Sequence, residues 1–230
     1  MAPAPVDPRW PKILSLSVHE FRTPLTVVGG YIRMLLKERG GPLSDQQRHL
    51  LEEAEKSCAR LSTLLADVSD LSNLEQGNIT MNLGTGDLRD LLRTVVGQLP
   101  PVPDREMRVD LQIGDGPAPV RADITRLGTA LTALLTALRR ELVTSDVLIV
   151  RERRAAGDGA ALFDICIGDA PTLAAIDGCA GDLPVFDEWR GGCGLALPVA
   201  RRVIEAHGGS IWSAPDDFKA GARLLLPESR

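Results

Sequence analysis

Apolar residues recur in alternating steps of four and three along the first third of the chain. This heptad spacing places them on one stripe of an α-helix, as in helices that pack lengthwise against other helices. Asp7, Pro8 and Pro11 precede the stripe and are typical of a helix start. The stripe consists of Leu14, Val18, Phe21, Leu25, Val28, Ile32 and Leu35.

A second heptad stripe follows after a short interruption. The Gly-Gly-Pro run at residues 40–42 breaks the first helix, because glycine ends helices and proline often follows such ends. Ser44 and Gln47 then have the S-x-x-Q spacing of a capping box, which predicts a new helix start. A connection this short makes the two helices antiparallel neighbours. The second stripe consists of Leu50, Ala54, Ser57, Leu61, Leu64, Val68 and Leu71.

The apolar faces of both predicted helices are wider than a single partner helix covers. Leu51, Cys58 and Leu65 add a second apolar row to the later helix. A second copy of the chain would bury these rows in a four-helix bundle, and we therefore expect a homodimer. The alternative is that the extra row packs on the chain's own C-terminal part.

From residue 79 onward, short alternating runs mix with helical stripes, which is typical of an α/β layer. The sequence therefore predicts an α+β protein with two domains. These are an antiparallel helical hairpin at residues 1–78 and a two-layer α/β sandwich at residues 79–230. Helices are expected at residues 87–99, 125–142 and 195–206. Strands are expected at residues 108–113, 120–121, 147–153, 161–167, 210–214 and 222–226.

Composition and charge argue against several classes of protein. The 230 residues carry a formal net charge of −5, which gives no reason to expect nucleic-acid or anionic-membrane binding. No apolar run is long enough to cross a bilayer, and residues 1–6 lack the apolar segment of a signal peptide. The four cysteines show no C-x-x-C spacing, so we expect reduced thiols in a cytoplasmic protein. The three histidines suggest no metal cluster.

One stretch of the first helix combines groups that can do chemistry. On a helix, residues four apart share a face, so His19 and Thr23 point out together. Glu20 lies about 100° round the helix from His19 and reaches the same space. Pro24 has no N–H and clashes with the carbonyl of Glu20, so the helix should bend there. The alternative is an ordinary surface histidine without a special task.

Together with the heptads and the loop, these residues resemble the transmitter core of bacterial sensor histidine kinases over nearly the full chain. Residues 19–25, H-E-F-R-T-P-L, are similar to the family's H-box. The other similar segments are Asp123 with Arg126 and Leu127 at the start of the N-box helix, Asp169 at the first glycine box, residues 192–197 at the second glycine box, and residues 203–212 after it.

The resemblance implies phosphoryl chemistry for the H-box residues. His19 would accept a phosphoryl group on an imidazole nitrogen, and Glu20 would orient the ring or take its proton. Thr23 would help to position a water that hydrolyses a phosphoaspartate on a partner. That partner would be the receiver domain of a response regulator, lying against the bundle near His19. For Thr23 the alternative is a hydroxyl that only satisfies a backbone carbonyl.

The resemblance also implies a nucleotide site in the second domain. Asp169 would accept a hydrogen bond from an adenine amino group. Gly192 and Gly194 would allow phosphates to approach the N-terminus of the following helix, where free N–H groups and partial positive charge favour anions. A Gly-x-Gly pair alone is weak evidence, because many such pairs only form turns.

Three features of the second domain depart from the family pattern. The two N-box asparagines, one of which holds Mg²⁺ in the family, correspond to Ala133 and Ala137, which have no oxygen for a hard cation. Residues 169–173 lack both glycines of the D-x-G-x-G box. The segment between Phe186 and Gly192 corresponds to the loop that covers the bound nucleotide in the family, and here this segment is short. We therefore expect ATP use to be weak or absent, with Mg²⁺ binding doubtful and no metal ligand to assign.

Three functional hypotheses remain open from the sequence. The first is an autophosphorylating histidine kinase. The second is an ATP-independent phosphotransferase or phosphatase, because His19 can take a phosphoryl group from one response-regulator aspartate and pass it to another. The third is a scaffold that binds a receiver or another kinase without phosphoryl chemistry. The H-box favours phosphosignalling through His19, and the departures in the second domain favour the ATP-independent form of it.

Overall fold

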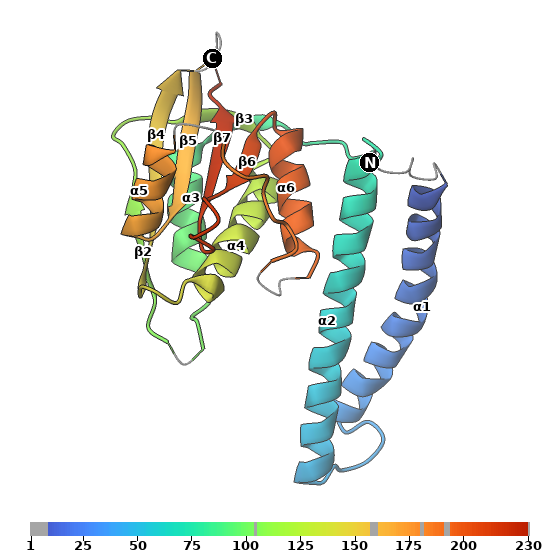
Figure 1. The fold of residues 1–230 in the computed structure, drawn as a ribbon. Helices are drawn as coiled ribbons and strands as arrows, with labels where there is room; N and C mark the ends of the chain where they lie inside the picture. Colours follow the sequence, from blue (N-terminus) through green and yellow to red (C-terminus); the bar gives the residue numbers. More distant parts are fainter. Residues whose placement is uncertain (1–8, 104, 157–160, 180–181, 191–193, 230) are drawn as a thin grey trace. The chain divides into compact units, whose positions relative to one another are not determined.

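A computed structural model describes residues 9–103, 105–156, 161–179, 182–190 and 194–229. The chain forms two compact units, residues 1–79 and 80–230, which are called here the N-terminal and the C-terminal unit. Each unit has its own secondary structure and is described separately (Figure 1).

The N-terminal unit is the antiparallel hairpin that the heptads predict. Helix α1 (Trp10–Leu36) and helix α2 (Asp45–Glu75) pack along each other. The capping box at the start of α2 is confirmed: Ser44 Oγ accepts from the Gln47 N–H at 3.3 Å, and the Gln47 side chain accepts from the Ser44 N–H at 2.9 Å. These two bonds satisfy donors that the first turn of a helix leaves free.

The loop between the helices differs in detail from the prediction. Helix α1 ends at Leu36, four residues before the first glycine of the Gly-Gly-Pro run. Glu38 takes a positive φ of 55°, which is uncommon outside glycine, and Gly41 takes φ 116°. Arg48 of α2 forms an ion pair with Glu38. This long-range contact stabilises a backbone conformation that the local sequence does not suggest.

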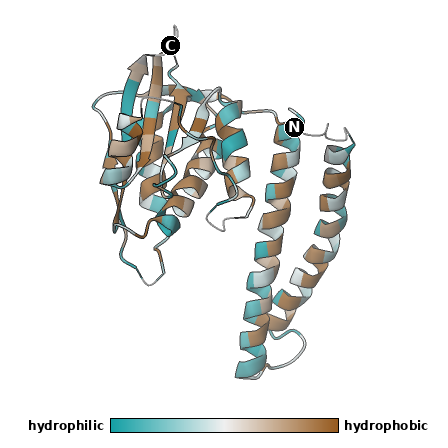
Figure 2. Cartoon of the chain, in the orientation of Figure 1, coloured by the Kyte–Doolittle hydropathy of each residue, from teal (hydrophilic) through white to brown (hydrophobic). Residues whose placement is uncertain are grey.

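The hairpin buries only part of its apolar stripe. Val18 and Ile32 are buried, whereas Phe21, Val28 and Leu35 are 61%, 48% and 41% exposed. Phe21 is therefore not packed within one chain, because α2 covers one side of the α1 stripe and leaves the other open. Hydrophobic residues recur along the length of both helices (Figure 2). The large exposed apolar residues of α2 are Leu50, Leu61 and Leu64.

The C-terminal unit is a mixed α/β layer, as expected. Its main sheet has the strand order β2-β4-β5-β7-β6, with β2 and β4 parallel and the other neighbours antiparallel. A separate two-stranded sheet pairs β1 with β3. The strands are β1 (Gly84–Asp87), β2 (Arg108–Gln112), β3 (Pro119–Ala122), β4 (Val147–Ala156), β5 (Ala161–Gly168), β6 (Ser210–Ser213) and β7 (Ala222–Pro227).

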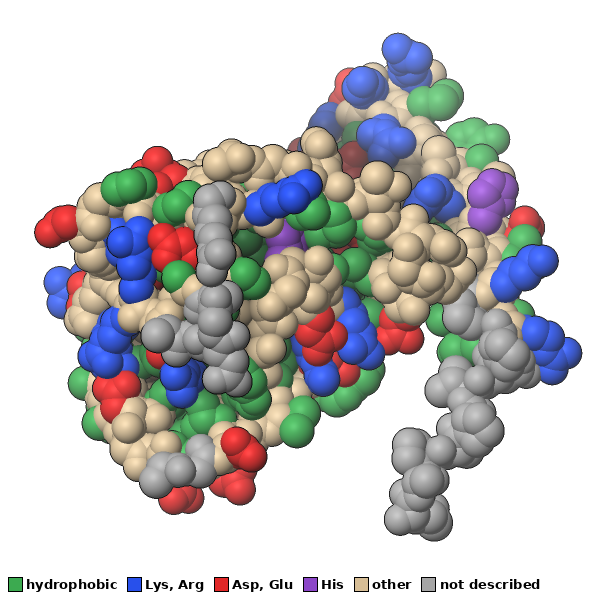
Figure 3. Space-filling model, turned by 90° about the horizontal axis from the view of Figure 1, so that it is seen from above, with side chains coloured by type: hydrophobic (Ala, Val, Ile, Leu, Met, Phe, Trp, Pro, Cys, Tyr) green, Lys and Arg blue, Asp and Glu red, His purple; other side chains and the backbone are tan. Residues whose placement is uncertain are grey.

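Three helices cover one face of the main sheet and form the hydrophobic core with it. They are α3 (Leu88–Gln98), α4 (Ile124–Glu141) and α6 (Ala196–Ala206). Asp87 and Asp123 cap the first two with their carboxylates, close to the predicted starts. On the visible face of this unit, acidic and basic side chains are mixed rather than segregated (Figure 3). The core includes Leu88, Leu131, Leu134, Leu148, Phe163, Ile165, Ile204 and Leu224.

A fourth helix, α5 (Ala170–Gly178), lies on the opposite face of the sheet and was not predicted (Figure 1). Leu173 and Ile176 of this helix pack with Cys166 of β5. Burial raises the pKa of the Cys166 thiol to about 11, and the nearby Asp164 carboxylate adds to this, so the thiol is unreactive at neutral pH. Strand β1 was also missed, because its four residues carry no hydrophobic period.

A buried ion pair ties α3 to the sheet. The guanidinium of Arg89 donates to both carboxylate oxygens of Glu152 on β4, at 2.8 and 3.0 Å, and both side chains are nearly fully buried. Arg89 also donates to the carbonyls of Asp115 and Gly116. Burial raises the pKa of Glu152, but the bonds from Arg89 and the Gly114 N–H outweigh it and hold the pKa below the ordinary value.

We expect Glu152→Gln to lower the free energy of unfolding of the C-terminal unit by about 3–5 kcal/mol, because it leaves a buried guanidinium without its counter-charge. Urea unfolding measures this change. Asp90→Asn is the control, since it removes an exposed partner of Arg93 on the same helix and should change little.

The same pair has a pH signature. A carboxylate with a lowered pKa in the folded state contributes stability above its unfolded value, near 4.5, and loses it as the pH falls through the folded value. The wild type should therefore lose stability below about pH 4.5 more steeply than Glu152→Gln. Equal slopes would show that Glu152 carries no linked charge.

Candidate functional site

His19 lies on the solvent-exposed surface of α1. Its side chain is 77% exposed, and its Nδ1 lies 3.6 Å from a carboxylate oxygen of Glu20, longer than a hydrogen bond but within ion-pair range. No described residue forms a hydrogen bond with Nε2. The predicted neighbours are thus together, with Glu20 on the Nδ1 side of the ring and Nε2 accessible.

Thr23 and Pro24 follow one turn later on the same helix. The Thr23 hydroxyl donates to the carbonyl of His19 at 3.5 Å, a long and therefore weak bond. Pro24 lies inside α1, which continues to Leu36. The hydroxyl is exposed and lies one turn from the imidazole, and its weak backbone bond leaves it available to a water. Its role in hydrolysis stays a prediction.

Asp169, the predicted adenine contact, caps α5. Its Oδ1 accepts from the Thr172 N–H at 3.0 Å and from the Thr172 hydroxyl at 2.5 Å, while its Oδ2 accepts from the Thr144 hydroxyl at 2.7 Å. Burial raises the pKa of Asp169, but the bonds from Thr172 and Thr144 outweigh it and keep the pKa below the ordinary value. Both carboxylate oxygens are therefore already engaged within the protein.

The second glycine box is only partly described. Gly192 lies outside the described residues, so its predicted role is not addressed. Gly194 takes a positive φ of 61° just before α6, a conformation that glycine adopts without strain. Leu195 at the helix start makes no side-chain cap. The predicted anion-binding role of Gly194 stays a prediction.

The N-box positions offer no ligand for a hard cation. Ala137 is fully buried in the core and Ala133 is half-buried. The hydroxyl of Thr132, one residue earlier, donates to the carbonyl of Gly128 at 2.8 Å. Within the described part of the chain, no group of three or more His, Cys, Asp or Glu side chains is arranged to hold a metal. The expectation that ATP use is weak or absent stays a prediction.

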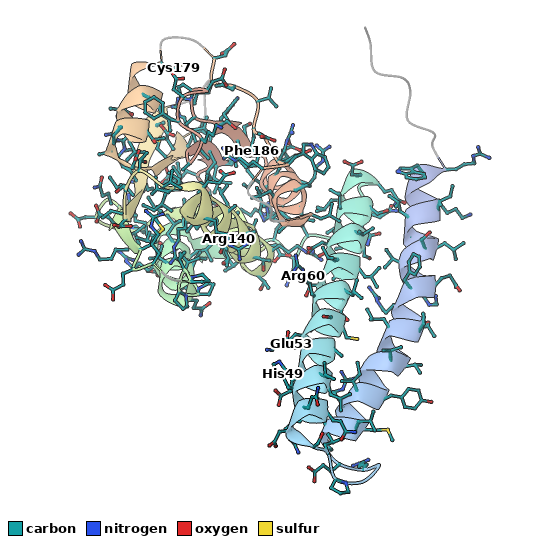
Figure 4. All side chains as sticks on the ribbon, turned by 60° about the horizontal axis from the view of Figure 1, so that its bottom comes forward. His49, Glu53, Arg60, Arg140, Cys179 and Phe186 are labelled. Atoms are coloured by element: carbon teal, nitrogen blue, oxygen red, sulfur yellow. The ribbon has the colours of Figure 1, made fainter. Side chains whose placement is uncertain are left out.

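The short segment before the second glycine box is fixed to the sheet. The carbonyl of Pro184 accepts from the Ser213 N–H at 3.0 Å, and the Ser213 hydroxyl accepts from the Asp187 N–H at 3.0 Å. Phe186 lies in the interior of the unit, where Figure 4 labels it, and the Arg190 guanidinium lies 4.9 Å from its ring centre. The segment therefore lies along the edge of the sheet, next to the strand β6 that carries Ser213.

Sequence reasoning missed several contacts that shape this region. Thr144 and Thr172, which engage Asp169, lie in no recognised motif. His207 joins two helices: its Nε2 accepts from the Asp123 N–H at 2.9 Å, and its Nδ1 lies 2.7 Å from the carbonyl of Val203. The Asp-cap spacing of residues 169–172 was the one available signal for α5.

Residues 13–77 match the family model of the His Kinase A (phospho-acceptor) domain. This match covers α2 and most of α1, including His19. Among the described residues, no helix is both long and apolar enough to span a membrane.

Curated relatives match most of the chain. The circadian input-output histidine kinase CikA of Synechocystis is 30% identical over 84% of this chain, and that of Synechococcus elongatus is 28% identical over 87%. The histidine-protein kinase BarA of Escherichia coli is 28% identical over 84%. The chain spans 27% of either CikA protein and 22% of BarA.

Solved structures share the fold. Full-length ShkA in complex with AMPPNP gives a TM-score of 0.68 at 24% identity, covering 95% of this chain and 45% of that one. The Acinetobacter baumannii histidine kinase AdeS gives 0.56 at 19% identity, covering 92% and 97%. The phospho-acceptor model, the curated relatives and these folds together identify the chain as a transmitter core of the sensor histidine kinase family.

Proposed function

We propose that the chain carries a phosphoryl group on His19 and exchanges it with the aspartate of a response-regulator receiver domain. The exposed imidazole with Glu20 beside its Nδ1 is the observation that carries this proposal. A ring whose Nδ1 holds its proton toward Glu20 presents the Nε2 lone pair to a partner. The proposal extends the family's two-component signalling to a specific residue of this chain.

The transfer step follows from this geometry. Nε2 attacks the phosphorus of an aspartyl phosphate, an N–P bond forms, and the P–O bond breaks to release the aspartate carboxylate. The imidazole gains positive charge as it is phosphorylated, and the Glu20 carboxylate near Nδ1 offsets that charge. The reverse step returns the phosphoryl group to a receiver. Thr23 would orient the water that instead hydrolyses the receiver's phosphoaspartate.

The bundle that presents His19 would be completed by a second copy of the chain. A groove of about 530 Å³ on the hairpin is lined by Phe21, Leu25, Val28 and other apolar residues of both helices. Its apolar lining suits another apolar helix face, and removing such surface from water favours association. The homodimer follows from the same stripe that the hairpin leaves open.

ATP is not the phosphoryl donor of this chain in our proposal. Ala133 and Ala137 supply no oxygen for Mg²⁺, and phosphoryl transfer from ATP depends on metal ions to neutralise charge. Asp169 has both oxygens bonded to Thr172 and Thr144, so an adenine amino group would have to share an oxygen with one of them. A phosphorylated receiver is then the source of the phosphoryl group.

Cys58 and Cys166 carry free thiols. Free thiols fit a reducing compartment, where response regulators would also meet the chain. We therefore place this transmitter core in the cytoplasm.

Incubation with a ³²P-labelled receiver domain tests the proposal. Label should pass to the wild type and to His49→Ala but not to His19→Ala, because only His19 lies beside Glu20 on α1. His49 is on the side of α2 that points away from α1 (Figure 4), which makes it a matched control. Labelled ATP with Mg²⁺ should leave all three unlabelled. Label from ATP on the wild type and on His49→Ala, but not on His19→Ala, would restore the autophosphorylating kinase.

Thr23→Ala should slow dephosphorylation of the receiver, while His19 still accepts phosphate at the wild-type rate. The hydroxyl makes only a weak bond to the His19 carbonyl, so helix stability should hardly change. Receiver phosphate loss and His19 labelling are followed in parallel. Equal loss of both activities would show that Thr23 is structural, whereas Thr23→Ser should retain the hydrolysis.

Leu61→Asp should convert the dimer to a monomer, because it places an unpaired charge in the proposed interface. Leu61 is half-exposed in one chain, so the hairpin itself should survive, as judged by circular dichroism. Arg60→Asp is the control, since Arg60 points away from α1 (Figure 4). Light scattering gives the mass. A dimer that persists in Leu61→Asp would mean that the interface lies elsewhere.

A further inference from the structure

The imidazole of His207, at the C-terminal end of α6, makes two hydrogen bonds that fix its protonation state. Its Nε2 accepts from the backbone N–H of Asp123 at 2.9 Å, and its Nδ1 lies 2.7 Å from the carbonyl oxygen of Val203. A backbone N–H can only donate, and a carbonyl oxygen can only accept. The ring is therefore neutral, with its proton on Nδ1 and a lone pair on Nε2.

Asp123, which donates to this ring, is a junction within the C-terminal unit. Its Oδ1 accepts from the Arg126 N–H at 3.1 Å and caps α4. Its Oδ2 accepts from the backbone N–H of Asn82 at 3.2 Å. Asn82 lies two residues after Thr80, where the C-terminal unit begins. A series of hydrogen bonds thus runs from α6 through Asp123 to the start of this unit.

Protonation of His207 is incompatible with the bond to Asp123. A second proton would lie on Nε2 and point at the Asp123 N–H, so that two donors would face each other. Asp123 is only 8% exposed, and a buried amide without an acceptor is costly. The neutral and the charged ring therefore cannot share one arrangement of this junction.

Charged side chains reach the surroundings of the ring from several elements. From α4 come the Asp123 carboxylate and Arg126, whose Nε lies 3.6 Å from Oδ2 of Asp123. From β3 comes Arg121, which lines a small cavity beside the ring, and the described residues of β7 that line this cavity are apolar. On α6 itself, Glu205 forms ion pairs with two arginines of the same helix. The Asp123 carboxylate is therefore the anion that a charged ring would meet.

This carboxylate stays charged when the ring titrates. Burial raises the pKa of Asp123, but the bonds from the Arg126 and Asn82 N–H groups outweigh it and keep the pKa below the ordinary value. An anion beside the ring favours the protonation that the Asp123 N–H opposes.

We propose that His207 is an acid-sensitive switch of the C-terminal unit. The neutral ring holds the Asp123 backbone to α6. The protonated ring turns its Nε2–H toward the Asp123 carboxylate, releases the Asp123 N–H, and loosens the bonded series that ends at Asn82. The switch goes beyond the phosphotransfer proposed for His19 and does not depend on it.

An NMR titration of the full chain from about pH 8 to about pH 5, the range in which histidine usually changes its charge, tests the inference. At the alkaline end, the ring nitrogens of His207 should show a proton on Nδ1 alone, and the Asp123 and Asn82 amides should exchange slowly. At the acid end both ring nitrogens should be protonated. The protection of the Asp123 amide, relative to its intrinsic exchange rate, should then fall about tenfold, the effect of losing one hydrogen bond, and that of Asn82 should fall with it.

His207→Gln separates the charge of the ring from any folding defect. The glutamine side-chain oxygen can accept from the Asp123 N–H but does not titrate, so both amides should stay protected at both ends of the titration. His49→Gln, at an exposed histidine of α2, should behave like the wild type.

Three results would overturn the inference. They are a proton on Nε2 at the alkaline end, protection of either amide that persists in the acid wild type, and an equal acid loss in His207→Gln. Each of these results leaves phosphoryl exchange at His19 untouched, so the two proposals can fail separately.

Discussion

The apolar stripe of α1 is the feature on which the N-terminal unit depends. A helix that presents apolar residues in steps of four and three needs partners on both sides of that stripe, and α2 supplies only one. The same stripe fixes the rotation of α1, and this rotation directs His19 outward while Val18 and Ile32 point inward. Packing thus decides which residue meets a partner, before any chemistry of the imidazole is considered.

In the C-terminal unit, the carboxylate of Asp169 has a corresponding influence on the local fold. Asp169 stands at the end of a central strand, where the family uses a flexible glycine-containing wall. Here Pro171 and Thr172 follow it, and proline in the first turn with a threonine donor favours a helix start. The carboxylate accepts hydrogen bonds from Thr172 and Thr144 of its own chain instead of remaining open to a ligand. The proline and the threonine at this point therefore explain the presence of α5.

Sequence reasoning reached the parts of the structure that depend on local pattern. The two long helices, the capping box at Ser44 and most strands follow from periodicity, which adjacent residues determine. It failed where the conformation depends on contacts between residues that lie apart in the sequence. Nothing near Glu38 signals that Arg48 holds it at positive φ, and nothing near Asp169 signals that Thr144 reaches it. Helix α5 is also too short for its period to be recognised.

The capped helix α5, which stands in place of a glycine-containing wall, has a consequence for how the C-terminal unit responds to a ligand. A glycine-rich wall loses conformational entropy when a ligand orders it, and that loss links binding to a change of shape. A wall that is already a capped helix has no such entropy left to lose. Binding of a ligand beside α5 would then cost little conformational entropy and would change the shape of the C-terminal unit little.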